Sequence, residues 1–297
     1  MRSTGLALQL DATPRPRGVS RMLRAGRIVH PFPTLLNVAA TAALAFIAAR
    51  GVPESRQLAT MLLTMLFAQS AIGVTNDLFD RDLDARTKPW KPLVAGLLSP
   101  QTAAVLAAAL AVAAVALAAT LGILGCALAV LGLACGLAYD VRLKRTMFSA
   151  VPYMVGIPVL PLWVWTVDGD WQPVMWWLLP LGGLIGLALH LANTLPDIDD
   201  DASQGVCGLA HRLGAQASML VAWASFGGGL ALSGAIAPFV TYDWRAYIPT
   251  AALGAACLAT TVALYTRRRD RFALQAGFAT LGVGSAVLAA GWLAAVS

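Results

Sequence analysis

Long apolar runs alternate with short polar segments along most of this chain. Each run is close to the ~20 residues that cross a bilayer as a helix. The runs cover residues 31–49, 57–79, 100–119, 122–139, 148–166, 173–196, 214–237, 246–266 and 272–296. The pattern predicts an all-α protein with nine transmembrane helices in one bundle. We expect a single transmembrane domain over 31–297, after a cytoplasmic tail of residues 1–30 with a short interfacial helix near 18–29.

Composition agrees with this prediction. Apolar residues make up 58% of the 297 residues and charged residues 12%, whereas soluble domains have about 45–50% and about 25%. A mean hydropathy of +0.71 excludes a disordered chain, and four cysteines without CxxC spacing imply no disulfide framework. No nucleic-acid partner is expected, and the oligomeric state is left open.

The basic residues are distributed asymmetrically between the predicted loops. With the N-terminus inside, 18 of the 21 Lys and Arg fall on the cytoplasmic side, as the positive-inside rule requires. We therefore expect a multi-pass cell-membrane protein with a cytoplasmic N-terminus and an extracytoplasmic C-terminus. Tryptophans around one extracytoplasmic loop are interpreted as an interfacial belt: Trp163, Trp165, Trp171, Trp176 and Trp177.

Two clusters of aspartate and asparagine carry the candidate chemistry. All but one of the 15 acidic residues are Asp. The first cluster, where the second run meets the cytoplasm, contains Asn76, Asp77, Asp80 and Asp84. The second, at the end of the sixth run, contains Asn193, Asp197 and Asp201. Both have the spacing Asn-x3-Asp-x3-Asp, which places three side chains along one stripe of a helix.

The duplicated spacing predicts a metal site between two halves of the bundle. The second and sixth runs are equivalent if runs one to four and five to eight form two pseudo-symmetric four-helix halves, with the ninth helix added. Both stripes would then face a central cavity. Carboxylate and amide oxygens suit Mg²⁺ bridging to a diphosphate, and the absence of His and Cys from the stripes argues against zinc or iron. An acidic loop that neutralises nearby arginines is the alternative, but it does not explain the repeated spacing.

At these residues the chain resembles the UbiA-type superfamily of membrane prenyltransferases. Within this superfamily it resembles members of the 4-hydroxybenzoate polyprenyltransferase type. Its NDxxDxxxD motif is matched by the first cluster, and its DxxxD motif by Asp197 and Asp201. The segment from Tyr139 to Arg145 resembles the family's Y-x-x-x-L-K-R block, and Lys91 stands where Arg is commoner. The resemblance implies nine helices around a cavity and transfer of an isoprenoid from an allylic diphosphate to an acceptor.

The resemblance also implies roles for particular residues. The Mg²⁺ ligands would be Asp77, Asp80, Asp84, Asp197 and Asp201. The diphosphate would be bound by Asn76, Asn193, Arg86, Lys91, Lys144 and Arg212. The catalytic residues would be Tyr139, Lys144 and Lys91. The expected partners are membrane lipid, an allylic prenyl diphosphate and a small acceptor, with an aromatic quinone precursor such as 4-hydroxybenzoate as the first choice.

Two other functions use the same features. An intramembrane terpene cyclase of this fold would need the same Mg²⁺ sites but no acceptor. A cation or metabolite transporter would use intramembrane acids, although it favours acids near the bilayer centre rather than at helix ends. For the predicted cationic contacts Arg86, Lys91 and Lys144, the alternative is the ordinary excess of basic residues on the cytoplasmic side. His190 is more readily explained as a core residue than as a ligand. Acceptors such as lipid glycerol phosphates, chlorophyll precursors or homogentisate also remain open.

Overall fold

The computed structural model describes residues 18–169, 171–203, 205–268 and 270–296. In these ranges the chain forms helices and no strand. Nine of the described helices are long and apolar enough to span a membrane: α2 (Pro31–Ala48), α3 (Ser55–Phe79), α5 (Pro100–Ala119), α6 (Ile123–Val141), α7 (Val151–Asp168), α8 (Leu178–Thr194, within the span Pro173–Asp197), α11 (Ala215–Ala235), α12 (Trp244–Arg267) and α13 (Arg271–Val296). The predicted membrane bundle is confirmed, with boundaries that differ by a few residues.

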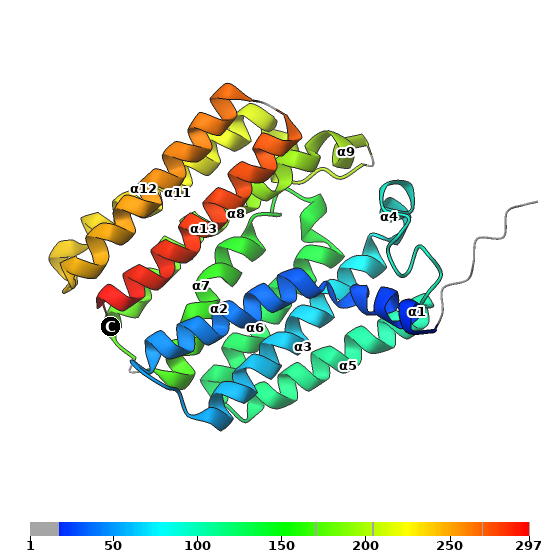
Figure 1. Ribbon diagram of the computed structural model, residues 1–297, viewed down its shortest axis with the longest axis horizontal. Coiled ribbons are helices and arrows are strands. Elements are labelled where there is room, and N and C mark those ends of the chain that lie inside the picture. The colour runs from blue at the N-terminus through cyan, green and yellow to red at the C-terminus, as the bar shows by residue number, and fades with distance from the viewer. Residues whose placement is uncertain (1–17, 170, 204, 269, 297) are drawn as a thin grey trace, which may run out of the picture.

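Short helical elements connect these spans. They are α1 (Gly18–Ala25), η1 (Gly26–Val29), α4 (Arg81–Thr87), η2 (Leu143–Arg145), η3 (Pro173–Trp177), η4 (Leu195–Asp197), α9 (Ile198–Ser203), α10 (Leu209–Leu213) and η5 (Ala237–Phe239). A helix was predicted where α1 and η1 lie, whereas the predicted tail before it, residues 1–17, is outside the described ranges. In Figure 1, α4 and α9 lie at the end of the bundle away from the C-terminus. We call this the acidic end, and the other the opposite end.

The sequence fixes several helix starts through local hydrogen bonds. Pro31 occupies the first turn of α2, where its missing N–H costs nothing. The Glu54 carboxylate accepts from the backbone N–H groups of Arg56 and Gln57 at the start of α3. Ser99 caps α5 in the same way through Thr102 N–H. These caps explain why the predicted and observed starts of α2, α3 and α5 agree closely.

The helices that carry the two acidic motifs lie inside the bundle. Helix α3 packs against α2, α5 and α6, and α8 packs against α7, α11 and α13. Gly186 allows α7 and α8 to approach closely, because a Cβ there would collide with the carbonyl oxygen of Tyr153. This contact brings the inner faces of α7 and α8 together near the acidic end.

The two ends of the bundle differ in polarity. The largest buried apolar cluster lies at the opposite end and includes Leu162, Met175 and Leu293. Trp163 and Trp165, each 2% exposed, belong to this cluster, so the prediction that they anchor at the headgroups was wrong. They lie on α7 faces that pack into the bundle, which the spacing of tryptophans cannot distinguish from lipid-facing ones. Buried aspartates gather at the acidic end instead.

Candidate functional site

Both acidic motifs lie at bends rather than on continuous helices. Asp80, with φ −99° and ψ 4°, separates α3 from α4. The second motif passes from α8 through the 3-10 turn Leu195–Asp197 into α9. Pro196 contributes to this break because it has no N–H to continue the α-helical ladder. The uninterrupted stripes expected from the spacing do not form, and the carboxylates of the first motif separate into two groups.

Asp77 and Asp84 form the first group, around Lys91. Each aspartate is 2% exposed. Lys91, in the loop after α4, places its Nζ 2.7 Å from Asp77 Oδ1 and 2.6 Å from Asp84 Oδ2. Burial lowers the pKa of Lys91, but the hydrogen bonds to the two carboxylates outweigh it and raise that pKa above its usual value. One ammonium therefore bridges two buried carboxylates.

Asp80 belongs to the second group, with Lys144 and Asp140. Lys144 Nζ lies 2.6 Å from Asp80 Oδ1 and 3.9 Å from Asp140 Oδ1. Asn76 Nδ2 donates to both aspartates, at 3.1 Å to Asp80 and 2.9 Å to Asp140. The exposed Arg145 lies 3.6 Å from Asp80. Sequence reasoning included Asp140 in the resemblance to the family but gave it no role.

His30 is a second residue that sequence reasoning missed. Its Nε2 lies 2.8 Å from Asp77 Oδ1, across 47 residues of the chain. The sequence shows only a histidine between the 3-10 turn that ends at Val29 and the helix that begins at Pro31. This arrangement matches neither acidic motif.

The second motif reaches the same end of the bundle. Asn193 Nδ2 donates to the Tyr153 hydroxyl at 3.4 Å, and Asp197 pairs with Arg271 at the start of α13. Burial and the Asp197 charge raise the pKa of Asp201, while His211 and Lys88 oppose this shift. The charge of Asp80 also raises the pKa of Asp201, which is consistent with both carboxylates lying at the acidic end.

An aromatic cluster adjoins the acidic groups. Tyr139 meets Tyr153 edge to face with ring centroids 5.4 Å apart, and His190 lies 5.1 Å from Tyr153 and 6.0 Å from Tyr139. Ser149 Oγ accepts from Leu209 N–H and lies 2.9 Å from His190 Nε2, which supports the interpretation of His190 as a core residue. Within the described ranges, the Tyr139 hydroxyl makes no hydrogen bond.

Two predicted diphosphate contacts form no ion pair with these clusters. Arg86 on α4 and Arg212 on α10 are exposed, and neither forms an ion pair with a described residue. Their contact with a diphosphate stays a prediction.

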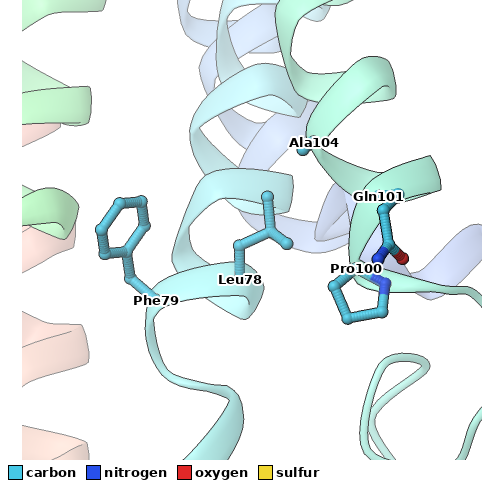
Figure 2. A pocket seen from close by; sticks show the side chains of 5 residues that line it. All are labelled: Leu78, Phe79, Pro100, Gln101 and Ala104. Atoms are coloured by element: carbon cyan, nitrogen blue, oxygen red, sulfur yellow. The ribbon is translucent and has the colours of Figure 1, made fainter.

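A groove opens beside the first motif. It has a volume of about 440 Å³ and is lined by Leu78, Phe79, Pro100, Gln101 and Ala104. Figure 2 shows these side chains at the end of α3 and the start of α5. None of the predicted site residues lines this groove, so we assign the chemistry to the polar clusters instead.

The donor atoms of these clusters fit a hard divalent cation. In the described part of the chain no three His, Cys, Asp or Glu side chains are gathered as a metal centre, and Lys91 bonds to both Asp77 and Asp84. Asp77 Oδ2 and Asp140 Oδ2 are nevertheless buried without a hydrogen-bond partner among the described residues, an arrangement that a bound ion explains. Oxygen donors of this kind are those Mg²⁺ prefers.

The fold and the buried carboxylate–lysine clusters define a multi-pass membrane protein with a polar site at one end of its bundle. Residues 36–280 match the UbiA prenyltransferase family. The chain belongs to this family, whose members transfer prenyl groups.

Two kinds of relative are similar to this chain in sequence. The 4-hydroxybenzoate octaprenyltransferase of Vibrio atlanticus (strain LGP32) is 28% identical over 195 residues, which are 63% of this chain and 67% of the relative. The digeranylgeranylglyceryl phosphate synthase of Natronomonas pharaonis is 30% identical over 214 residues, or 70% of this chain and 73% of the relative. The relatives thus carry two names that imply different acceptors.

A solved structure has the same fold. The UbiA homologue from Archaeoglobus fulgidus bound to DMAPP and Mg²⁺ superposes with a TM-score of 0.73 at 16% identity, covering 90% of this chain and 99% of that one. At this identity the likeness establishes a shared fold.

Proposed function

We propose that this protein transfers an isoprenoid from an allylic prenyl diphosphate to an aromatic quinone precursor such as 4-hydroxybenzoate, in an Mg²⁺-dependent reaction. The supporting observation is that two acidic motifs and two largely buried lysines lie at one end of the helical bundle. The names of the Vibrio relatives favour this acceptor.

We assign binding of the diphosphate to Lys91 and Lys144. An ammonium has three N–H donors. Lys91 uses two of them on Asp77 and Asp84, and Lys144 has one short contact, with Asp80. Each lysine therefore keeps at least one N–H for a phosphate oxygen, and such charge-assisted bonds are strong. Asn76 holds Asp80 and Asp140 in place.

We assign Mg²⁺ binding to Asp77, Asp80, Asp84, Asp197 and Asp201. A bound Mg²⁺ supplies positive charge that stabilises the departing diphosphate. The carboxylates of the first motif are already held at fixed positions by Lys91, Lys144 and Asn76.

We assign to Tyr139 the stabilisation of positive charge at the reacting carbon of the allyl group. Breaking the C–O bond leaves positive charge on the allyl group, which both the aromatic face and the hydroxyl oxygen of a tyrosine can attract. Tyr139 is packed by Tyr153 and His190, and its hydroxyl makes no bond to a described residue. A helical bundle in a bilayer limits the access of water, which would otherwise trap the cation.

A prenylated glyceryl phosphate is the second candidate acceptor, because the Natronomonas relative carries that name. The test incubates purified protein in detergent with Mg²⁺, geranylgeranyl diphosphate and either 4-hydroxybenzoate or geranylgeranylglyceryl phosphate, followed by mass spectrometry. Prenylated 4-hydroxybenzoate supports the first acceptor, and a diprenylated glyceryl phosphate supports the second. Because no ion gradient is present, diphosphate release in this assay also contradicts a transporter.

A further inference from the structure

His30 has an unfavourable backbone conformation at the start of the first membrane helix. Its φ of 49° and ψ of 65° are left-handed, which L-residues with a Cβ rarely adopt. Pro31 follows, and a residue before proline normally takes an extended conformation. A strained residue of this kind persists only where its surroundings hold it.

Two contacts with α3 hold His30 in this conformation. Its Nε2 lies 2.8 Å from Asp77 Oδ1. Its ring lies against Gly73, one turn before Asp77, where an added Cβ would be 3.2 Å from His30 Cβ and Cγ. Because Gly73 has no side chain, the imidazole can lie directly on the α3 backbone and reach the carboxylate.

The two oxygens of Asp77 are used unequally. Oδ1 accepts from His30 Nε2 and lies 2.7 Å from Lys91 Nζ. Oδ2 is buried and has no hydrogen-bond partner among the described residues. A carboxylate held through one oxygen by two donors from different elements cannot rotate freely. Its second oxygen is therefore kept available in a fixed direction.

We propose that His30 is a positioning residue that orients Asp77 so that Oδ2 is available to a divalent cation. This inference rests on the proposed function, which assigns Asp77 to the metal. The Asp77 carboxylate can only accept, so Nε2 carries the hydrogen. That N–H donates whether the imidazole is neutral or protonated, so the proposal does not depend on titration of His30.

The test measures Mn²⁺ binding to purified protein in detergent at fixed pH, by electron paramagnetic resonance, without any substrate. Loss of a group that orients a metal ligand typically costs 10–100-fold in metal affinity. We expect His30→Phe, which keeps a ring but has no donor, to raise the Mn²⁺ Kd by about 10–100-fold. His30→Gln, which restores an N–H donor, should recover much of that loss.

Gly73→Ala provides a second variant should His30→Phe fail to fold. The added methyl group displaces the His30 ring while leaving its donor intact, so Mn²⁺ affinity should again fall. An unchanged Kd in both folded variants, even with a lower melting temperature, overturns the positioning role alone. A wild-type protein that binds no Mn²⁺ overturns both this role and the metal site of the proposed function.

Discussion

Lys144 and Asp80 form a hydrogen-bonded ion pair of 2.6 Å that joins parts of the chain 64 residues apart. It ties η2 to the bend between α3 and α4, and both side chains are largely buried. Removal of one partner from a buried pair typically costs about 3–5 kcal/mol. The same residues that are proposed to bind substrate therefore also hold the acidic end together.

The first prediction concerns Asp80→Asn. This change keeps the shape of the side chain but removes the charge, so Lys144 loses its short ionic partner. Turnover should fall at least ~10²-fold, as for loss of a strong electrostatic stabiliser, and the melting temperature should also fall. Steady-state kinetics and thermal unfolding in detergent check both effects.

Asp82→Asn is the matched control for this variant. The Asp82 side chain is 92% exposed and pairs with Arg81 on the same short helix. Its turnover and melting temperature should equal those of the wild type. If Asp80→Asn has wild-type turnover, Asp80 takes no part in the reaction.

A second prediction concerns Lys91→Met. Without its ammonium, Asp77 and Asp84 are left as neighbouring buried charges, so the metal-free protein should melt at a lower temperature. Added Mg²⁺ should raise the melting temperature of the variant more than that of the wild type, because the ion replaces the lost positive charge. An equal Mg²⁺ response in the two proteins would contradict binding at these carboxylates.

The same pair of proteins should differ in their alkaline stability. Because the folded pKa of Lys91 is raised, its contribution is fully present below its usual pKa of 10.5 and is lost as pH rises through the folded value. The gap in melting temperature between wild type and Lys91→Met should therefore stay constant up to pH 10.5 and narrow above it. If the difference in melting temperature already narrows near neutral pH, the stabilising ion pairs of Lys91 with Asp77 and Asp84 are contradicted.

Asp201→Asn should have opposite effects on stability and activity. Burial and the charge of Asp197 raise the pKa of Asp201, so the folded state binds this proton more readily than the unfolded state. Its carboxylate thus lowers stability as pH rises from 3.8 through the folded pKa. At pH 7 without metal, the variant should melt above the wild type while its turnover falls. A lower melting temperature with full turnover would exclude this assignment.

Tyr139→Phe should slow prenyl transfer, because it removes the hydroxyl oxygen proposed to face the allyl cation, while leaving the melting temperature and diphosphate affinity nearly unchanged. Phenylalanine keeps the ring that packs against Tyr153, and the lost hydroxyl has no partner within the described residues. Kinetics, thermal unfolding and calorimetric diphosphate binding separate these effects.

Tyr242→Phe, at the opposite end of the bundle, is a control from which we expect the opposite pair of effects. The Tyr242 hydroxyl donates to the Ser233 carbonyl and accepts from Trp292 Nε1, so its loss should cost stability, about 1 kcal/mol per hydrogen bond, but no turnover. If Tyr139→Phe behaves like this control, Tyr139 has only a structural role.

The sequence predicted the spans because hydrophobic length is a property of each segment alone, and caps such as Ser99 mark their starts. It also predicted that Asp80 and Asp201 lie at the same end of the bundle. Each residue follows an apolar run that was predicted to cross the membrane in the same direction. It did not predict that Asp77 and Asp80 would have different lysine partners. Those partners come from distant segments, and helix periodicity does not specify which residue of a distant segment lies opposite a given side chain.

The missed residues have the same explanation. His30 contacts Asp77 across 47 residues, and Asp140 meets Asn76 across 64. Neither contact leaves a repeated spacing in the chain. Trp165 was misassigned because burial of a tryptophan depends on which face of α7 meets its neighbours.

In the proposed reaction an acceptor, and not an internal double bond of the prenyl chain, traps the allyl cation. The most direct measurement incubates purified protein with Mg²⁺ and geranylgeranyl diphosphate, with and without 4-hydroxybenzoate or geranylgeranylglyceryl phosphate, and identifies the products by mass spectrometry. We expect a product that contains both the prenyl group and an acceptor, formed only when that acceptor is present. A cyclised hydrocarbon or alcohol formed at the same rate without any acceptor would contradict prenyl transfer and identify a terpene cyclase.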